Sequence, residues 1–221
     1  MKPLQINKKR PLPMFWVVLA GSLLGFLLIL LLQPQREAIN EQQLPWNAYF
    51  DEQGQLHALG LTIGQSTVED ASLLYGKDLE IKLFSDWDQS NKSVEAYFPV
   101  VYIGSIKAAL ALKIAVPEAR MQAAFENGKK MTMAGSGGRE LELFNADKLE
   151  FMQLPITSLT LLPRNNLTER AIEMRFGQPD YREIQSDGLE HLFFTKLGLE
   201  MILDPEGPEA LQYATPASAP R

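Results

Sequence analysis

The sequence feature that most constrains this chain is residues 14–32, MFWVVLAGSLLGFLLILLL, where nineteen consecutive residues carry no charge. As an α-helix rising about 1.5 Å per residue, the stretch is roughly 28 Å long, and the hydrocarbon core of a bilayer is ~30 Å thick. Residues 14–32 therefore predict a transmembrane helix that attaches the rest of the chain to a membrane.

A cleaved signal peptide is the alternative, because it also begins with basic residues and continues with an apolar run. This run exceeds the roughly 7 to 15 residues usual for a signal core, and residues 33–36, QPQR, offer no small-x-small cleavage site. Four basic residues lie within residues 1–13, which predicts a cytoplasmic N-terminal segment and an exported C-terminal domain. We therefore expect a single-pass protein of the bacterial inner membrane with a periplasmic domain.

Gly21 and Gly25 form a G-x-x-x-G pair within the predicted span. Such a pair lets two helix backbones approach closely, because neither position carries a side chain. If the pair packs in this way, it predicts a homodimer formed through the transmembrane helix. Glycine is also common in membrane helices that make no such contact, so the ordinary lipid-facing alternative stays open.

The exported part of the chain is acidic and contains no cysteine. The whole sequence has a formal net charge of −6, and residues 33–221 carry 17 basic against 27 acidic groups. An acidic surface repels phosphate backbones, so we expect no nucleic-acid binding by the main domain. The lack of cysteine excludes disulfides, thiolate metal sites, cysteine nucleophiles and lipidation on an N-terminal cysteine.

Composition and turn signals divide the chain after the predicted span. The parts are a linker at 33–45, a first α+β unit at 46–162, a second unit of helix and antiparallel sheet at 163–214, and a disordered tail at 215–221. The units are α+β because their strands follow one another at hairpin-length connections, which exclude the long crossovers of a parallel sheet.

The first unit begins with a hairpin at 47–59, and residues 51–54, DEQG, supply a turn led by aspartate and closed by glycine. A helix follows within 64–76, where Ser66 and Glu69 match a capping box and Gly76 suits the C-terminal position. Later elements are predicted as follows: strands at 79–85 and 94–104; a strand or buried helix at 106–116; a helix at 118–127 after Pro117; a loop at 135–138; strands at 140–144 and 149–162 with a turn at 145–148; and Pro155 as a bulge or edge marker.

Residues 165–177 repeat the pattern of the first helix 101 residues later. The repeat aligns Thr67 with Thr168, Ala71 with Ile172, Tyr75 with Phe176, and Gly76 with Gly177. An antiparallel meander is then predicted at 181–185, 189–197 and 199–203, with turns at 187–188 and 198, and residues 204–207 echo the turn at 51–54. One helix followed by strands, occurring twice, predicts a pseudo-repeated α+β fold.

The stretches 61–64 and 67–76, and their counterparts at 168–179 and 189–203, resemble the SmpA/OmlA (BamE-like) domain of small bacterial envelope lipoproteins. The resemblance implies a fold like that of the β-lactamase inhibitory protein, with helices packed on an antiparallel sheet, and a non-enzymatic binding or assembly role in the envelope. It carries no catalytic residues. Members of that family are tethered by a lipid on an N-terminal cysteine, whereas this chain has no cysteine and a predicted peptide anchor.

Residues that commonly bind metals are few and poorly spaced. His57 and His191 are the only histidines, so a histidine-rich metal site is excluded, and we expect each to lie on a strand in a structural or surface role. Asp86, Asp88 and Ser90 imitate the start of a calcium loop. Asn91 and Tyr97 then replace the required glycine and glutamate, so we expect a solvated loop.

No catalytic motif is complete in the sequence. Ser136 lies in AGSGG, which resembles a nucleophile elbow, but a strand pattern follows where a helix is required. The same glycines lack the ending of a phosphate-binding loop. Carboxylates are plentiful, and a glycosidase needs only two of them across a cleft, so that alternative stays open.

We therefore expect a non-enzymatic domain, without cofactor or metal, that binds envelope proteins through the face or edge of its sheet. Two alternatives remain at this point: an envelope glycan hydrolase that uses paired carboxylates, and a small-ligand sensor, which would show a closed apolar pocket.

Overall fold

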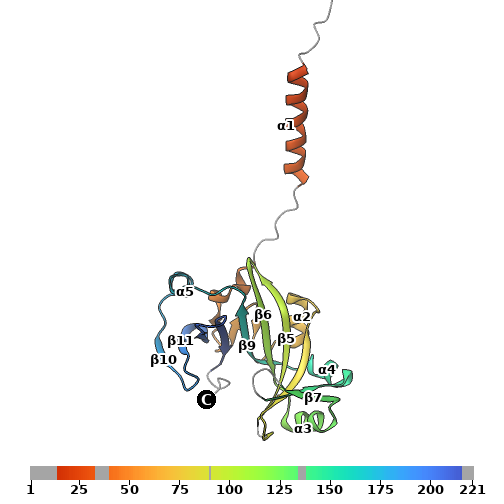
Figure 1. Ribbon diagram of the computed structural model, residues 1–221, viewed down its shortest axis with the longest axis vertical. Helices are drawn as coiled ribbons and strands as arrows, with labels where there is room; N and C mark the ends of the chain where they lie inside the picture. Colours follow the sequence, from red (N-terminus) through yellow and green to blue (C-terminus); the bar gives the residue numbers. More distant parts are fainter. Residues whose placement is uncertain (1–13, 33–39, 90, 134–137, 216–221) are drawn as a thin grey trace, which may run out of the picture. The chain divides into compact units, whose positions relative to one another are not determined.

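The computed structural model of the chain describes residues 14–32, 40–89, 91–133 and 138–215 (Figure 1). Several predicted features lie outside these ranges: the basic segment, most of the linker, Ser90, Ser136 with most of its loop, and nearly all of the tail. The chain separates into two compact units, Met1–Ala38 and Ile39–Arg221.

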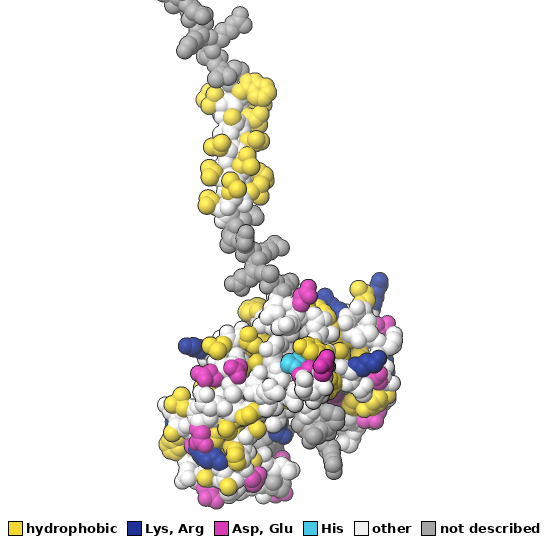
Figure 2. Space-filling view, turned by 180° about the vertical axis from the view of Figure 1, so that it is seen from behind, with side chains coloured by type: hydrophobic (Ala, Val, Ile, Leu, Met, Phe, Trp, Pro, Cys, Tyr) yellow, Lys and Arg dark blue, Asp and Glu magenta, His cyan; other side chains and the backbone are white. Residues whose placement is uncertain are grey.

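Helix α1 (Met14–Leu32) is the described part of the first unit. It has a mean hydropathy of 2.7 and is long and apolar enough to cross a membrane. Hydrophobic side chains cover the face of the helix seen in Figure 2, and large hydrophobic residues are exposed along its whole length. The helix is compatible with a single-pass membrane anchor, and also with a signal sequence, which can meet the same criteria of length and composition.

The described residues of the second unit form one antiparallel sheet of ten strands in the order β10-β11-β12-β13-β9-β6-β5-β4-β8-β7. The strands are β4 (Glu80–Ser85), β5 (Lys92–Ile103), β6 (Ile106–Ile114), β7 (Lys130–Met133), β8 (Arg139–Glu142), β9 (Ile156–Pro163), β10 (Tyr181–Ile184), β11 (Glu190–Phe194), β12 (Leu199–Leu203) and β13 (Ala210–Ala214). Both predicted α+β stretches contribute strands, so they share one sheet.

A smaller sheet and several short helices complete the second unit. The sheet consists of β1 (Tyr49–Phe50), β2 (Leu56–Ala58) and β3 (Leu61–Thr62). The helices are α2 (Val68–Tyr75), α3 (Glu118–Asn127), α4 (Asn145–Phe151) and α5 (Glu169–Phe176), with 3-10 turns η1 (Glu41–Gln43), η2 (Pro45–Asn47) and η3 (Thr195–Leu197). This large antiparallel sheet with short helices confirms the predicted α+β class.

One face of the large sheet, the covered face, packs against these helices and the small sheet (Figure 1). Successive strand residues alternate between faces, so on β5 the buried Val94, Ala96 and Phe98 point into the core. The helices bury side chains in the same core cluster: Val68 and Ala71 from α2, Met121 and Ala124 from α3, Phe151 from α4, and Ile172 from α5. The opposite face, the open face, presents the polar and aromatic positions of the same strands.

The central strands settle an ambiguity left by the sequence. Residues 106–116 were compatible with a strand or a buried helix, and the structure forms β6, which pairs with β5 on one side and β9 on the other. The register shifts between Lys113 and Ile114, close to Pro155, which precedes β9. Irregular pairing beside a proline fits its predicted role as a bulge or edge marker.

The N-cap of helix α2 lies one residue later than predicted. The prediction of a capping box formed by Ser66 and Glu69 was wrong, because Thr67 and Asp70 form it instead: Thr67 Oγ1 accepts from the Asp70 amide at 3.1 Å, and the Asp70 carboxylate accepts from the Thr67 amide at 2.8 Å. The Ser66 hydroxyl accepts from the Thr62 amide at 2.9 Å and closes the preceding turn. Gly76 ends the helix with a φ of 97°, as predicted.

Helix α4 replaces the turn predicted at 145–148 and the start of the strand predicted at 149–162, so both predictions were wrong. The reason is tertiary: Arg120 of α3 donates to the carboxylates of both Asp147 and Glu150, which lie on one side of a helical turn. Phe151 is completely buried at the end of α4. The strand therefore starts only at Ile156, after Pro155.

The later elements largely follow their predictions. Helix α5 is capped by Thr168, whose hydroxyl accepts from the Ala171 amide at 3.2 Å, and ends at Gly177 with a φ of 82°. Strands β10, β11 and β12 form the predicted meander, and Gly188 and Gly198 have positive φ at its turns. Strand β13, between β12 and β9, was not predicted.

Candidate functional site

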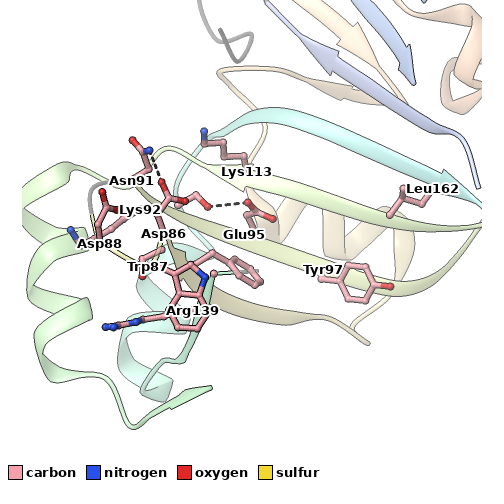
Figure 3. Close-up of a pocket in the computed structure, with 14 residues that line it drawn as sticks. Asp86, Trp87, Asp88, Asn91, Lys92, Glu95, Tyr97, Lys113, Arg139 and Leu162 are labelled. Carbon is pink, nitrogen blue, oxygen red and sulfur yellow. Dashed lines mark hydrogen bonds between the residues drawn. The ribbon is translucent and has the colours of Figure 1, made fainter. Parts of the chain in front are cut away.

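The open face of the large sheet contains a groove of about 1400 Å³, which we call the open-face groove (Figure 3). It extends from the β4–β5 loop across the middle of the sheet. The lining residues are Phe84, Ser85, Asp86, Trp87, Asp88, Asn91, Lys92, Ser93, Glu95, Tyr97, Lys113, Gly138, Arg139 and Leu162. The groove is thus made from β4, β5, β6, β8, β9 and one loop.

Strand alternation and register place the side chains of the groove. Ser93, Glu95 and Tyr97 point to the open face because their neighbours on β5 point into the core. Glu95 lies directly opposite Lys113 of β6, and Tyr97 lies opposite the small Ala111. A second hollow of about 540 Å³ shares Tyr97 and Leu162 with the groove, so the two adjoin.

The end of the groove beside the β4–β5 loop carries an exposed tryptophan. Trp87 is 52% exposed, and the Arg139 guanidinium lies 5.9 Å from the centre of its ring. Figure 3 shows the two side chains next to each other at this end, with Tyr97 farther along β5. Gly138, just before β8, lets the chain pass close to the end of β4, because a Cβ atom there would lie 2.5 Å from the Ser85 carbonyl oxygen.

Hydrogen bonds within the β4–β5 loop fix its shape. The Asp86 carboxylate accepts from the Asn91 side-chain amide at 2.6 Å, and Lys92 Nζ donates to the Gln89 carbonyl at 2.8 Å. Gln89 has a φ of 63°, a left-handed conformation needed to turn the chain. Among the described residues, no three His, Cys, Asp or Glu side chains come together as a metal site, and the predicted Ser90 lies outside them.

A row of charged side chains on β4 and β8 borders the groove. Lys82 of β4 lies between Glu80, at 2.8 Å, and Glu140 of β8, at 2.9 Å. The hydrogen bonds that Lys82 donates to Glu80 and Glu140 raise the pKa of Lys82, and the bond that Glu80 accepts lowers the pKa of Glu80. In contrast, Lys113 in the groove forms no ion pair with any described residue.

The two histidines lie on strands, as predicted, and each is held by hydrogen bonds. His57 on β2 is half-buried, with Nε2 at 2.9 Å from the Asp51 carboxylate and Nδ1 at 3.0 Å from the Thr62 hydroxyl. Its ring stacks on Tyr49 with the centroids 4.8 Å apart. The Asp51 carboxylate, which leads the predicted turn, therefore also orients this ring.

His191 on β11 belongs to the open face but is only 3% exposed. Its Nδ1 lies 2.6 Å from the Glu200 carboxylate and its Nε2 lies 3.0 Å from the Asp187 carboxylate. Burial opposes protonation, but the hydrogen bonds with Glu200 and Asp187 outweigh it and raise the pKa of His191. The histidine thus ties the β10–β11 turn to β12.

Of the residues named in the comparison with a calcium loop, Asp86, Asp88, Asn91 and Tyr97 line the groove, and Ser90 lies outside the described residues. Gly21 and Gly25 lie on α1, where a Cβ atom added at either position would meet no described neighbour within 4 Å, so their packing stays a prediction. Sequence reasoning did not identify Trp87, Lys113 or Arg139. The alternation of side chains along β5 could have placed Tyr97 on the open face. Only the strand order shows which residues of other strands line the groove beside Tyr97.

Comparisons with protein-family models, curated proteins and solved structures found no match to this chain.

Proposed function

We propose that this chain is a single-pass membrane protein whose exported domain binds an envelope protein on its open face, without catalysis and without a cofactor. The observation that carries the proposal is the open-face groove, which is lined by the exposed Trp87 of the β4–β5 loop, the exposed Tyr97 of β5 and the half-buried Arg139 of β8. Tryptophan, tyrosine and arginine are the residue types that contribute most to protein–protein binding energy. Lys113, which has no ion-pair partner among the described residues, supplies a charge that an acidic side chain of the partner would neutralise.

The location of the protein forms the second part of the proposal. Helix α1 has the length of a membrane span, and the four basic residues before it favour a cytoplasmic N-terminus under the positive-inside rule. The domain would then lie in the periplasm of a bacterial inner membrane. Gly21 and Gly25 would pack two copies of the span, because they remove side chains from one helix face.

We also propose that the domain is a pseudo-repeat of the SmpA/OmlA type, an assignment that rests on the sequence resemblance. Matching helix ends support it. Thr67 and Thr168 cap α2 and α5, and Gly76 and Gly177 end them with φ values of 97° and 82°. At equivalent positions, Ala71 and Ile172 are buried in the same core, and antiparallel strands follow each helix.

Site-specific photocrosslinking in native membranes tests the binding face. We expect p-benzoylphenylalanine in place of Tyr97 to crosslink one envelope protein reproducibly, whereas the same group in place of Leu73 does not. Leu73 is a suitable control because it is 76% exposed but lies on α2, which packs on the covered face. Equal capture at both positions, or none at Tyr97, would contradict the proposal.

A second variant links the crosslink to the groove itself. Trp87→Ala in the same chain should lower the crosslinking yield at position 97 by at least about tenfold, because an aromatic anchor contributes about 2 kcal/mol to such interfaces and about 1.4 kcal/mol corresponds to tenfold. Met174→Ala, at an exposed position on α5, should leave the yield unchanged. An equal loss from both variants would place the partner elsewhere.

Glycan hydrolysis is the second candidate, because Asp86, Asp88 and Glu95 line the same groove. The binding proposal predicts that the purified full-length protein releases no reducing ends from cell-wall glycan. Release that is abolished by Glu95→Gln or Asp86→Asn would establish the hydrolase instead.

A further inference from the structure

A smaller cavity, of about 200 Å³, lies where η2, the β5–β6 turn and α5 meet. We call it the η2–α5 cavity. It shares no lining residue with the open-face groove, so the function proposed for the groove does not depend on it. Most of its lining residues are apolar or aromatic, Ser105, Asn165 and Asn166 are polar, and the charged lining residues are all basic.

The interior of the cavity suits a flat apolar group. Leu161 and Leu211, both almost completely buried, contribute core side chains to the lining. Trp46 and Phe176 add two aromatic rings that meet edge to face, with their centroids 6.1 Å apart. A cavity of roughly 150 Å³ accepts a benzene molecule, so about 200 Å³ accepts a ring with a short side arm.

The charged lining residues suit an anion. The guanidinium of Arg175 lies 4.4 Å from the centre of the Trp46 ring, and Lys107 also lines the cavity. Neither cation forms an ion pair with any described residue, and no aspartate or glutamate is among the lining residues. A guanidinium stacked on a ring keeps its N–H groups at its edge, where they can bind a carboxylate in bidentate fashion.

We propose that the η2–α5 cavity binds a carboxylate joined to an apolar group of about the size of a benzyl ring. The ring lies against Trp46 and Phe176, and the carboxylate binds Arg175 and Lys107. Two sources supply this chemistry: a free arylalkanoic acid, and the C-terminus of a polypeptide that ends in an aromatic residue.

Isothermal titration calorimetry of the full chain in neutral detergent tests the proposal with 3-phenylpropionate as the probe. We expect it to bind at least about tenfold more tightly than 3-phenylpropanol, which has the same ring but no charge. A short peptide ending in phenylalanine, and the same peptide with an amidated C-terminus, form the second arm. Tighter binding by the free-acid peptide identifies a polypeptide terminus as the source, and tighter binding by 3-phenylpropionate identifies a small molecule.

Three variants assign the binding to this cavity. Arg175→Gln should weaken binding by about tenfold, whereas Arg170→Gln, on the same helix but outside the lining, should leave it unchanged. Ala171→Met places a longer side chain in the cavity and should abolish binding, with unfolding followed by circular dichroism as the check on the fold.

The proposal is overturned if the alcohol binds as tightly as the acid, or if neither the acid nor the peptide binds at millimolar concentration. It is equally overturned if a folded Ala171→Met variant retains full affinity, or if Arg175→Gln and Arg170→Gln have the same effect.

Discussion

Tyr97 and Phe98 are neighbours on β5, but Phe98 is fully buried in the core whereas Tyr97 is 38% exposed and lines the open-face groove. The same contrast runs along the strand, where Val94 and Ala96 are buried and Ser93 and Glu95 line the groove. One strand thus supplies both the covered face, which holds the fold together, and the open face, which is free to bind. Substitutions on the two faces should therefore affect different measurements.

The largest difference in the free energy of unfolding should be between substitutions of the neighbours Phe98 and Tyr97. Phe98→Ala removes a fully buried aromatic ring and should lower the free energy of unfolding by about 3–5 kcal/mol. Tyr97→Ala should lower it by less than about 1 kcal/mol, because the side chain points away from the core and is partly exposed to solvent. Chemical denaturation of the full chain in detergent measures both. A similar stability loss for the two variants would show that the open face also contributes to the core.

A buried hydroxyl on the covered face should have the next largest effect. Tyr213 of β13 is completely buried, and its hydroxyl donates to the Pro45 carbonyl at 2.7 Å, which joins the sheet to η2. Tyr213→Phe leaves that carbonyl without its partner and should cost about 1–2 kcal/mol. Denaturant midpoints of the two proteins give the value. If the midpoint does not change, water must satisfy the carbonyl in the variant.

Removing a helix cap, which lies on neither face of the sheet, should lower the free energy of unfolding by a smaller amount. Thr67→Ala removes the side-chain half of the capping box at α2 and should cost about 1 kcal/mol. Thr168→Ala removes the corresponding cap of α5, and the proposed pseudo-repeat predicts a similar loss. Thermal unfolding of both variants, measured side by side, compares them. A loss at only one helix would contradict their equivalence.

The pH dependence of stability should be the smallest effect, and it concerns the one histidine that is buried on the open face. The pKa of His191 is raised in the folded protein, so its contribution to stability is complete below the ordinary histidine value near 6.5 and is lost as the pH rises through the raised pKa. The free energy of unfolding should therefore fall as the pH rises above about 6.5. In His191→Gln this part of the pH dependence should disappear, and its persistence would assign it to another group.

The sequence allowed the strands of the sheet to be predicted wherever side chains alternated clearly. Side chains at 94–98, VEAYF, alternate between the core and the open face, and the strand predicted at 94–104 covers nearly the same residues as β5. Residues 145–151 were misassigned, because the helix is stabilised by Arg120, which lies in a different element. Residues 210–214 contain few β-branched side chains, and β13 forms because β12 and β9 offer partners on both sides.

The groove could be predicted only in part, for a related reason. The alternation on β5 shows that Glu95 and Tyr97 share a face, but Arg139 and Leu162 reach the same groove through the strand order. That order follows from packing over the whole domain and leaves no local signal. The η2–α5 cavity is even harder to predict from the sequence, because its lining residues Trp46, Lys107 and Arg175 come from three separate segments.

The position of β13 has a consequence for how the domain is completed during synthesis. It is the last described strand in sequence order, yet it lies inside the sheet, between β12 and β9. A chain is synthesised from its N-terminus at roughly 5–20 residues per second. One edge of β9 therefore stays unpaired until residues 210–214 have been made. A chain released early would keep two open strand edges, which readily pair with other chains. Protection from aggregation therefore depends on β13, the last of the described strands.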